Sequence, residues 1–188
     1  MDWILASASP RRKELLAEVI DNFDIVPAVG EEIVEGNPDP KTLVQLLAKQ
    51  KAAEVASRAG MENRAVLGAD TVVAIGNEVL GKPKDEADAF RMLQALSGRE
   101  HQVYTGVCIL FPAKNGQRIE KTDADCTNVY FYKLTAEQIA AYIATGSPMD
   151  KAGAYGIQDG GLVERIEGSF SNVVGLPIEL VKRMITEV

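Results

Sequence analysis

The stretch that decides the fold is Val66-Leu67-Gly68-Ala69-Asp70-Thr71-Val72-Val73-Ala74-Ile75. It is an apolar, β-branched run interrupted only by Asp70 and Thr71, which is typical of a strand buried on both faces of a sheet. Gly76-Asn77 follows and predicts a turn into a short return strand at Val79-Leu80. A buried strand of this kind is expected in an α/β protein whose sheet is covered by helices.

Elements on both sides of this strand fit the same class of fold. A short strand at 2–7 leads into a helix with Ser9 as N-cap and Pro10 as first residue. Further helices are predicted from Pro40 to a stop at Gly60, over 85–96, after the capping box Thr135-x-x-Gln138, and around Leu180 to Ile185. Strands are predicted at 101–111 and 118–133, with a hairpin signal at Lys114-Asn115-Gly116. We therefore expect one α/β domain over 1–188, built on a mixed sheet and formed either as a single body or as two lobes around a cleft.

The segment from Gly146 to Gly175 differs in composition from the rest of the chain. It holds seven of the 16 glycines, and its first part reads Asp150-Lys151-Ala152-Gly153-Ala154-Tyr155-Gly156-Ile157-Gln158-Asp159. Glycine allows positive φ and close backbone approach, while a lysine offers charge and a glutamine amide can read a base edge. A long glycine-rich connection of this kind is expected to be a functional loop.

Composition limits the class of partner. The chain of 188 residues has 20 Lys and Arg against 27 Asp and Glu, a formal net charge of −7, which repels nucleic-acid polymers at long range. Cys108 and Cys126 form no C-x-x-C pair, so neither a disulfide framework nor a cysteine-rich zinc site is supported. No signal-peptide pattern or membrane span is found, so a cytoplasmic setting and no membrane partner are expected.

Basic residues nevertheless gather beside small hydroxyl residues in Ser7-Ala8-Ser9-Pro10-Arg11-Arg12-Lys13. This segment lies at a predicted turn from strand to helix, where free backbone N–H groups and forked guanidinium groups can bind phosphate oxygens. A solvated basic first turn is the alternative, but cations oppose the helix dipole at that end. The segment therefore predicts a phosphate cradle.

Asp70 is the second candidate, because an acid inside a buried strand is costly without a cation, a metal or a catalytic task. The alternative is a structural carboxylate bonded to backbone amides. Lys82, after Gly81 at the end of a strand, could supply a counter-charge from the segment Gly76–Pro83. That segment nearly matches a Walker A loop, but Pro83 replaces the hydroxyl residue that holds magnesium.

Two other acidic or titratable features are weaker. Glu31-Glu32 is either a solvated charge pair or the source of a magnesium ligand. His101 is the only histidine, so a histidine-based metal site is excluded and a structural role in a strand is expected.

Taken together, these segments resemble the Maf family of nucleotide pyrophosphatases over essentially the whole chain. The residues that carry the resemblance are Ser7-x-Ser9-Pro10-Arg11-Arg12, Glu31-Glu32, Lys51, Gly68–Thr71, Leu80–Pro83, Ser97-Gly98 with His101, Asp150–Gln158 and Asn172–Pro177. The resemblance implies a fold like that of inosine-triphosphate pyrophosphatases, a mixed twisted sheet with flanking helices and a central cleft. It also implies hydrolysis of a nucleoside triphosphate to monophosphate and pyrophosphate with a divalent metal, Mg²⁺ or Mn²⁺, and a possible homodimer.

The resemblance assigns roles to individual residues. Asp70 matches the family's general base, and Glu32 with Asp70 would hold the metal. The positions that match phosphate or substrate binding are Ser7, Arg11, Arg12, Lys51, Thr71, Lys82, Lys151 and Gln158. Arg11, Thr71 and Gln158 fit the branch that resembles dTTP/UTP pyrophosphatases, whereas Asp159 departs from the family pattern, which often has glycine there.

Two alternatives to dTTP and UTP hydrolysis stay open at this point. One is a pyrophosphatase that removes modified nucleotides. The other is a non-catalytic protein that inhibits septum formation in cell division, an association of the same family, for which the sequence shows no exposed amphipathic or low-complexity module.

Overall fold

The structure of the chain is a computed structural model that describes residues 1–112 and 117–187. The chain divides into two compact units. Unit 1 comprises Met1–Asp70, Thr105–Asp125 and Gly175–Val188, and unit 2 comprises Thr71–Tyr104 and Cys126–Val174. The hairpin signal at Lys114-Asn115-Gly116 lies outside the described residues.

The strands form a mixed sheet, as the sequence predicts. Its strands are β1 (Trp3–Leu5), β2 (Phe23–Ile25), β3 (Ala65–Ile75), β4 (Glu78–Leu80), β5 (Glu100–Leu110), β6 (Glu120–Phe131) and β7 (Val163–Glu167). The order is β2-β1-β3-β5-β6-β7, and β4 pairs with β3. Strand β1 is parallel to both β2 and β3, whereas β3 with β4 and β6 with β7 are antiparallel pairs. The buried run that opened the sequence analysis is therefore the strand β3.

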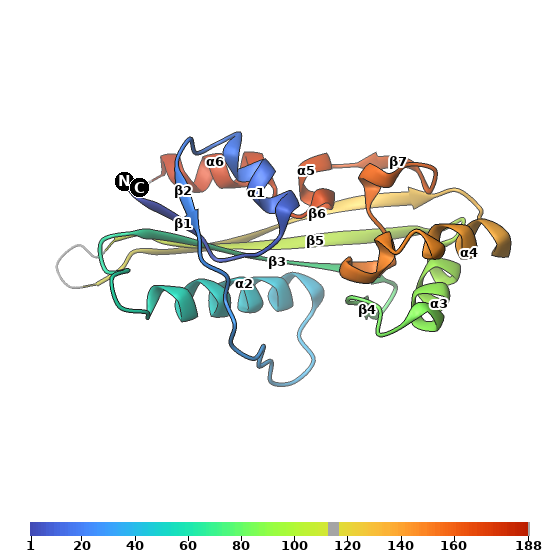
Figure 1. The fold of residues 1–188 in the computed structure, drawn as a ribbon, viewed down its shortest axis with the longest axis horizontal. Coiled ribbons are helices and arrows are strands. Elements are labelled where there is room, and N and C mark those ends of the chain that lie inside the picture. Colours follow the sequence, from blue (N-terminus) through green and yellow to red (C-terminus); the bar gives the residue numbers. More distant parts are fainter. Residues whose placement is uncertain (113–116, 188) are drawn as a thin grey trace. The chain divides into compact units, whose positions relative to one another are not determined.

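Helices flank the strands and are labelled in Figure 1. They are α1 (Pro10–Ala17), α2 (Pro40–Ala56), α3 (Glu86–Leu96), α4 (Ala136–Ala144), α5 (Phe170–Val174) and α6 (Ile178–Thr186), with 3₁₀ turns η1 (Ser147–Asp150), η2 (Ala152–Ala154) and η3 (Ile157–Asp159). No helix among the described residues combines the length and hydropathy that crossing a bilayer requires.

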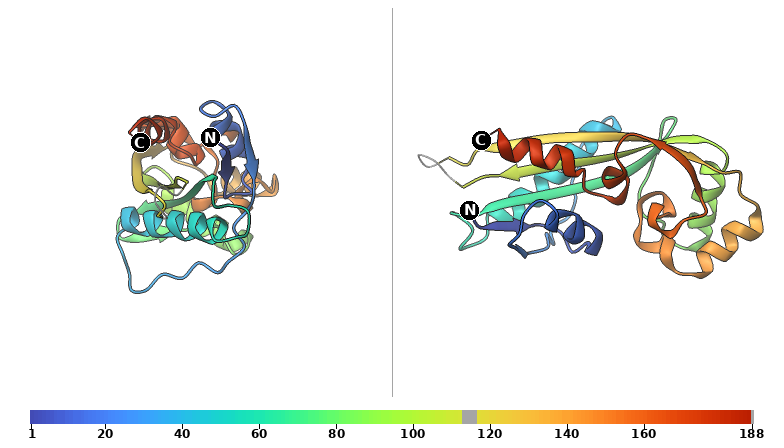
Figure 2. Two further views of the ribbon diagram at one scale, coloured as in Figure 1. Left: turned by 90° about the vertical axis from the view of Figure 1, so that its left-hand side faces the viewer. Right: turned by 90° about the horizontal axis from the view of Figure 1, so that it is seen from above.

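Unit 1 has apolar cores on both faces of its strands. In β1 the side chains alternate, so that Trp3 and Leu5 pack with α1 and α6 while Ile4 packs with α2. Figures 1 and 2 show this arrangement, with α2 along one face of the strands and α1 and α6 along the other. Gly68 of β3 allows the close approach of α2, because an added Cβ would lie 2.7 Å from the backbone nitrogen of Ala52.

Unit 2 is built around a single apolar cluster. Side chains of β3, β5 and β6, among them Val73, Val103 and Phe131, pack against α3 and α4. The capping box of Thr135 and Gln138 opens α4 as the sequence predicts. His101 is fully buried in this cluster, with its Nε2 2.8 Å from the hydroxyl oxygen of Tyr155 and its ring edge-on to Phe131. This burial agrees with the structural role that the sequence predicts for the histidine.

Two expectations about local structure were wrong. Helix α2 ends at Ala56, earlier than the expected stop, and Gly60 lies beyond it with a φ of 84°. The segment from Gly146 to Gly175 is not one long loop, since it folds into three 3₁₀ turns, the strand β7 and the helix α5. Hydrogen bonds among polar side chains of residues 147–159, described below, hold the 3₁₀ turns together. Composition alone did not predict these contacts.

Candidate active site

The turn after β1 carries the residues of the predicted phosphate cradle. Ser9 caps α1 by accepting a hydrogen bond from the Arg12 backbone N–H at 3.4 Å, and Pro10 is the first helical residue. Ser7 is buried, and its hydroxyl oxygen accepts hydrogen bonds from the Ser9 N–H at 3.2 Å and from Arg12 Nη1 at 3.4 Å. The small hydroxyl residues thus fix the turn and one side of a guanidinium.

Arg12 is held rigidly at this turn. Its Nε donates a hydrogen bond of 2.8 Å to the carbonyl oxygen of Gly175, at the start of the last segment of unit 1. Burial lowers the pKa of Arg12, and Arg11 adds to this lowering, whereas Asp70 and Glu32 act in the opposite direction. Arg12 therefore lies within electrostatic range of both carboxylates, and a partly buried guanidinium interacts strongly with an anion because little water screens it.

Lys51 joins the two carboxylates that were predicted to bind metal. Its Nζ is 2.9 Å from Glu32 Oε1 and also forms an ion pair with Asp70 Oδ1. The side chains of Lys51 and Asp70 are only 20% and 12% exposed, so this pair is shielded from solvent, whereas Glu32 is half exposed. Lys51 lies on α2 and Asp70 on β3, the two elements that Gly68 brings into close contact.

Glu32 reaches this group because the segment that carries it is fastened to α2. The amide of Gln50 accepts a hydrogen bond from the Ile33 backbone N–H at 3.1 Å and donates one to the Ile33 carbonyl oxygen. Glu54, one turn further along α2, accepts a hydrogen bond of 3.0 Å from the Val29 N–H. Sequence reasoning missed Gln50 and Glu54, and the only available signal was their i, i+4 spacing, which puts both on one face of α2.

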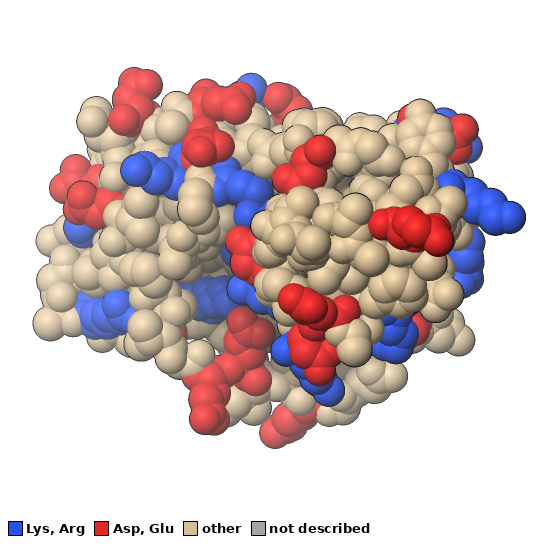
Figure 3. Space-filling view, turned by 45° about the vertical axis from the view of Figure 1, so that its right-hand side comes forward, with Lys and Arg blue, Asp and Glu red and all other residues tan. Residues whose placement is uncertain are grey.

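Unit 1 therefore gathers five of the predicted site residues into one charged group. Arg12 and Lys51 supply two cations and Glu32 and Asp70 supply two carboxylates, and Arg11, which interacts electrostatically with Arg12, adds a third cation. The group has a net charge of plus one inside an acidic protein. On the face drawn in Figure 3 acidic and basic side chains are interspersed.

Glu32 and Asp70 are suited to a hard divalent cation only if a bound substrate supplies further oxygen atoms. Glu32 and Asp70 offer carboxylate oxygens, which Mg²⁺ and Mn²⁺ prefer, and Mg²⁺ is often held by one or two carboxylates together with substrate phosphates. Within residues 1–112 and 117–187 no group of three or more His, Cys, Asp or Glu side chains could hold a metal. The two residues thus fit a cation that arrives with a polyphosphate.

Unit 2 carries the remaining predicted residues. Thr71 follows Asp70 on β3 and is half-buried, and Lys82 is exposed just beyond β4. The carbonyl oxygen of Gly81 accepts a hydrogen bond of 3.0 Å from the Gly153 N–H, so the segment that carries Lys82 is tied to η2. Gln158 is exposed on η3.

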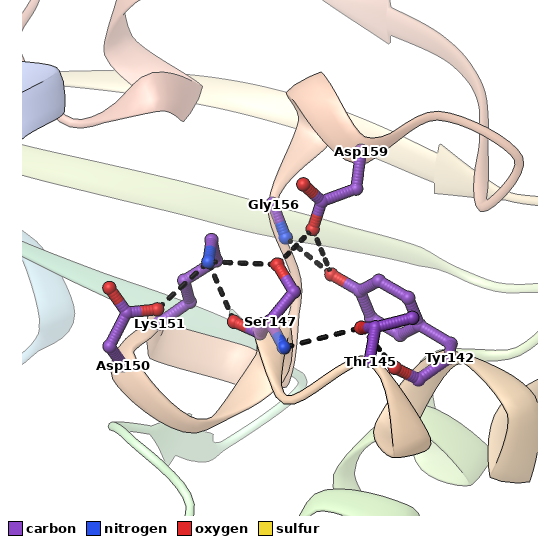
Figure 4. A network of polar contacts seen from close by, with 7 residues as sticks. All are labelled: Tyr142, Thr145, Ser147, Asp150, Lys151, Gly156 and Asp159. Atoms are coloured by element: carbon purple, nitrogen blue, oxygen red, sulfur yellow. Dashed lines mark hydrogen bonds and ion pairs between the residues drawn. The ribbon is translucent and has the colours of Figure 1, made fainter.

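Lys151 and Asp159 lie in a polar network drawn in Figure 4. Lys151 Nζ donates to the Ser147 carbonyl oxygen at 2.6 Å, to the Ser147 hydroxyl at 3.0 Å and to Asp150 Oδ1 at 2.8 Å. Asp159 Oδ2 accepts hydrogen bonds of 2.6 Å from the hydroxyl groups of Tyr142 and Ser147. The acid that departs from the family pattern is therefore engaged by one hydroxyl group of α4 and one of η1.

Comparisons with known proteins agree with this picture. A model of the family described as Maf-like protein matches residues 2–188. The chain is 50% identical over 188 residues to the dTTP/UTP pyrophosphatase of Agathobacter rectalis, covering 93% of this chain and 91% of that protein. It is 50% identical over 183 residues to the dTTP/UTP pyrophosphatase of Thermococcus gammatolerans, covering 96% and 94% of the two chains.

Solved structures show the same fold at low identity. The Ham1 protein of Staphylococcus aureus matches with a TM-score of 0.53 and 13% identity, covering 100% of this chain and 99% of that one. A HAM1 protein from Coxiella burnetii matches with a TM-score of 0.52 and 14% identity, and both chains are covered completely. With the family model and the relatives at half identity, these findings establish that the chain belongs to the Maf-like protein family.

Proposed function

We propose that the chain hydrolyses dTTP and UTP to the nucleoside monophosphate and pyrophosphate. The observation that carries this proposal is the group in unit 1 in which Lys51 joins Asp70 and Glu32 within electrostatic range of Arg12. The names of the relatives at half identity support the choice of bases.

Phosphate binding is proposed for the cationic residues of this group. Arg12 is held by Ser7 and Gly175, so its guanidinium is oriented before any ligand arrives. Arg11 and Lys51 add charge, and the capped start of α1 adds backbone N–H donors. Such preorganised cations would stabilise the charge that moves onto the leaving pyrophosphate.

Asp70 is proposed as the general base. Its carboxylate would accept a proton from a water molecule as the water oxygen bonds to a phosphoryl phosphorus. The bond from that phosphorus to the oxygen that bridges the α and β phosphates breaks in the same displacement. Its electron pair leaves on pyrophosphate when the α-phosphorus is attacked, and on the nucleoside monophosphate when the β-phosphorus is attacked. Lys51, paired with Asp70, would keep the carboxylate oriented toward that water.

A divalent metal is proposed to bind at Glu32 and Asp70 together with the phosphates. When bound, Mg²⁺ or Mn²⁺ would neutralise phosphate charge and polarise the phosphoryl group. Thr71, Lys82, Lys151 and Gln158 remain predicted substrate contacts, and a homodimer remains a prediction for sedimentation analysis.

The test is pyrophosphate release from dTTP and UTP in the presence of Mg²⁺ or Mn²⁺. Asp70→Asn is expected to lower kcat by about 10² to 10⁴, the usual contribution of a general base, with an unchanged circular dichroism spectrum. Asp21→Asn, at an exposed position outside the group, is the matched control and should behave like the wild type.

A panel of nucleotides separates the alternatives. Full activity of purified Asp70→Asn would rule out the assigned base. Faster hydrolysis of modified nucleotides than of dTTP and UTP would favour a role in removing them, and no pyrophosphate release from any nucleotide would favour the non-catalytic role.

A further inference from the structure

We propose that Tyr142 and Asp159 are positioning residues that fix the segment 151–159 and thereby the choice of nucleobase made by Gln158. This inference rests on the proposed function, in which Gln158 contacts the base. Its basis is the network in Figure 4, which links side chains from α4 and η1 to both ends of that segment.

Asp159 is the acceptor at the centre of the network. One oxygen of its carboxylate, Oδ2, accepts hydrogen bonds from the hydroxyl groups of Tyr142 and Ser147, each at 2.6 Å. Hydroxyl donors at this distance from a carboxylate form the stronger, charge-assisted class of hydrogen bond. Because Asp159 directly follows Gln158 in the chain, its two contacts restrain the backbone on one side of the glutamine.

Tyr142 restrains the other side. Its hydroxyl oxygen also accepts a hydrogen bond of 3.0 Å from the Gly156 backbone N–H, two residues before Gln158. Burial and the bond to Asp159 raise the pKa of the Tyr142 hydroxyl. The group therefore stays protonated at neutral pH and remains a donor to Asp159.

Ser147 and Lys151 extend the network to the start of the segment. The Ser147 hydroxyl donates to Asp159 and accepts from Lys151 Nζ, which also donates to the Ser147 carbonyl oxygen and to Asp150. These three contacts use the three N–H donors of an ammonium group. The ammonium group of Lys151 is therefore the end of the network in this structure.

The backbone of the segment requires such restraint. Ala154 has a φ of 61°, in the left-handed region that costs free energy for a residue with a side chain. At Gly156 an added Cβ would lie 2.8 Å from Lys151 Cε and 3.2 Å from Asp159 Oδ2, so both side chains pack directly against the glycine. A strained and tightly packed segment holds one conformation only while its contacts are intact. The position of Gln158 therefore depends on the hydrogen bonds of Tyr142 and Asp159.

The experiment compares Tyr142→Phe, Asp159→Ala and Asp159→Asn by steady-state kinetics with dTTP, UTP and CTP. For Tyr142→Phe and Asp159→Ala we expect KM for UTP to rise and the preference for UTP over CTP to fall by about tenfold, the factor that one hydrogen bond supports. We expect kcat to change by less than about twofold, because the group around Asp70 is untouched. Asp159→Asn keeps an acceptor oxygen and should retain most of the preference.

Controls and a second readout separate positioning from general damage. Tyr132→Phe, at a half-exposed tyrosine outside the network, should leave KM and the base preference unchanged. Amide hydrogen exchange at Gly156 should accelerate in Tyr142→Phe, since that N–H loses its acceptor.

Two results would overturn the inference. One is an unchanged ratio of UTP to CTP hydrolysis with unchanged exchange at Gly156. The other is an equal loss of kcat on every nucleotide, which is the effect of a scaffold residue. If the wild-type protein releases no pyrophosphate from dTTP or UTP, the proposed function itself fails, and the role of Gln158 in base choice fails with it.

Discussion

Gly68→Ala tests whether the approach of α2 to β3 creates the charged group of unit 1. Gly68 lies two residues before Asp70 on β3, and Ala52 follows Lys51 on α2. An alanine Cβ at position 68 would lie 2.7 Å from the Ala52 backbone nitrogen and closer still to the Ala48 carbonyl oxygen. Backbone atoms of a helix cannot rotate away, so the whole helix has to move.

The size of the effect follows from this geometry. Ordinary contact begins at 3.4 Å, so α2 would have to retreat by about 0.7 Å to clear Ala52 and by more than that to clear the closer Ala48 carbonyl oxygen. An overpacking change of this kind typically costs about 1–3 kcal/mol. That cost corresponds to a fall of about 1 M in the urea midpoint. The same movement separates Lys51 from Asp70, and misplacement by about 1 Å can lower activity about 100-fold.

Both effects are measurable in one preparation. Trp3 is the only tryptophan and lies in the core of unit 1, so its fluorescence in urea reports the stability of that unit, while pyrophosphate release from dTTP reports the site. Gly30→Ala is the matched control, since its Cβ would make only an ordinary contact of 3.5 Å with Glu54. A Gly68→Ala protein with wild-type stability and wild-type kcat would refute the reasoning.

Two further predictions concern one side chain in each unit. Burial lowers the pKa of His101 to about 4 from 6.5. As the pH falls, the histidine of the unfolded chain is therefore protonated before that of the folded chain. The free energy of unfolding should fall by about 3 kcal/mol between pH 6.5 and pH 4. The single imidazole signal in NMR checks this, and a midpoint near 6.5 in the folded protein would contradict it. Gln50→Ala removes the hydrogen bond that holds Ile33 to α2. The ion pair of Glu32 with Lys51 should then be lost, and KM for UTP should rise about tenfold. Gln45→Ala on the same helix should leave KM unchanged, and equal KM values for the two variants would disprove the role of Gln50.

The sequence predicted elements wherever a local cause is sufficient. The apolar run of β3, the Ser9-Pro10 start of α1 and the capping box at Thr135 each depend on residues a few positions apart, and all three are confirmed. The prediction from the sequence failed where contacts between residues farther apart in the chain determine the local structure. The glycine-rich segment after α4 looked like a loop, because the hydrogen bonds that Asp159 accepts from Tyr142 and Ser147 leave no periodic pattern.

For the site, the sequence by itself determined which chemical groups are present. A carboxylate inside an apolar strand and arginines at the start of a helix are unfavourable unless something compensates for them, so Asp70 and Arg12 were recognisable one at a time. Only the tertiary structure decided that Lys51 joins Asp70 to Glu32, and that Gln50 fastens the segment carrying Glu32 to α2. The physical reason is that ion pairs depend on separation in space, and here that separation is set by the packing of a helix against Gly68.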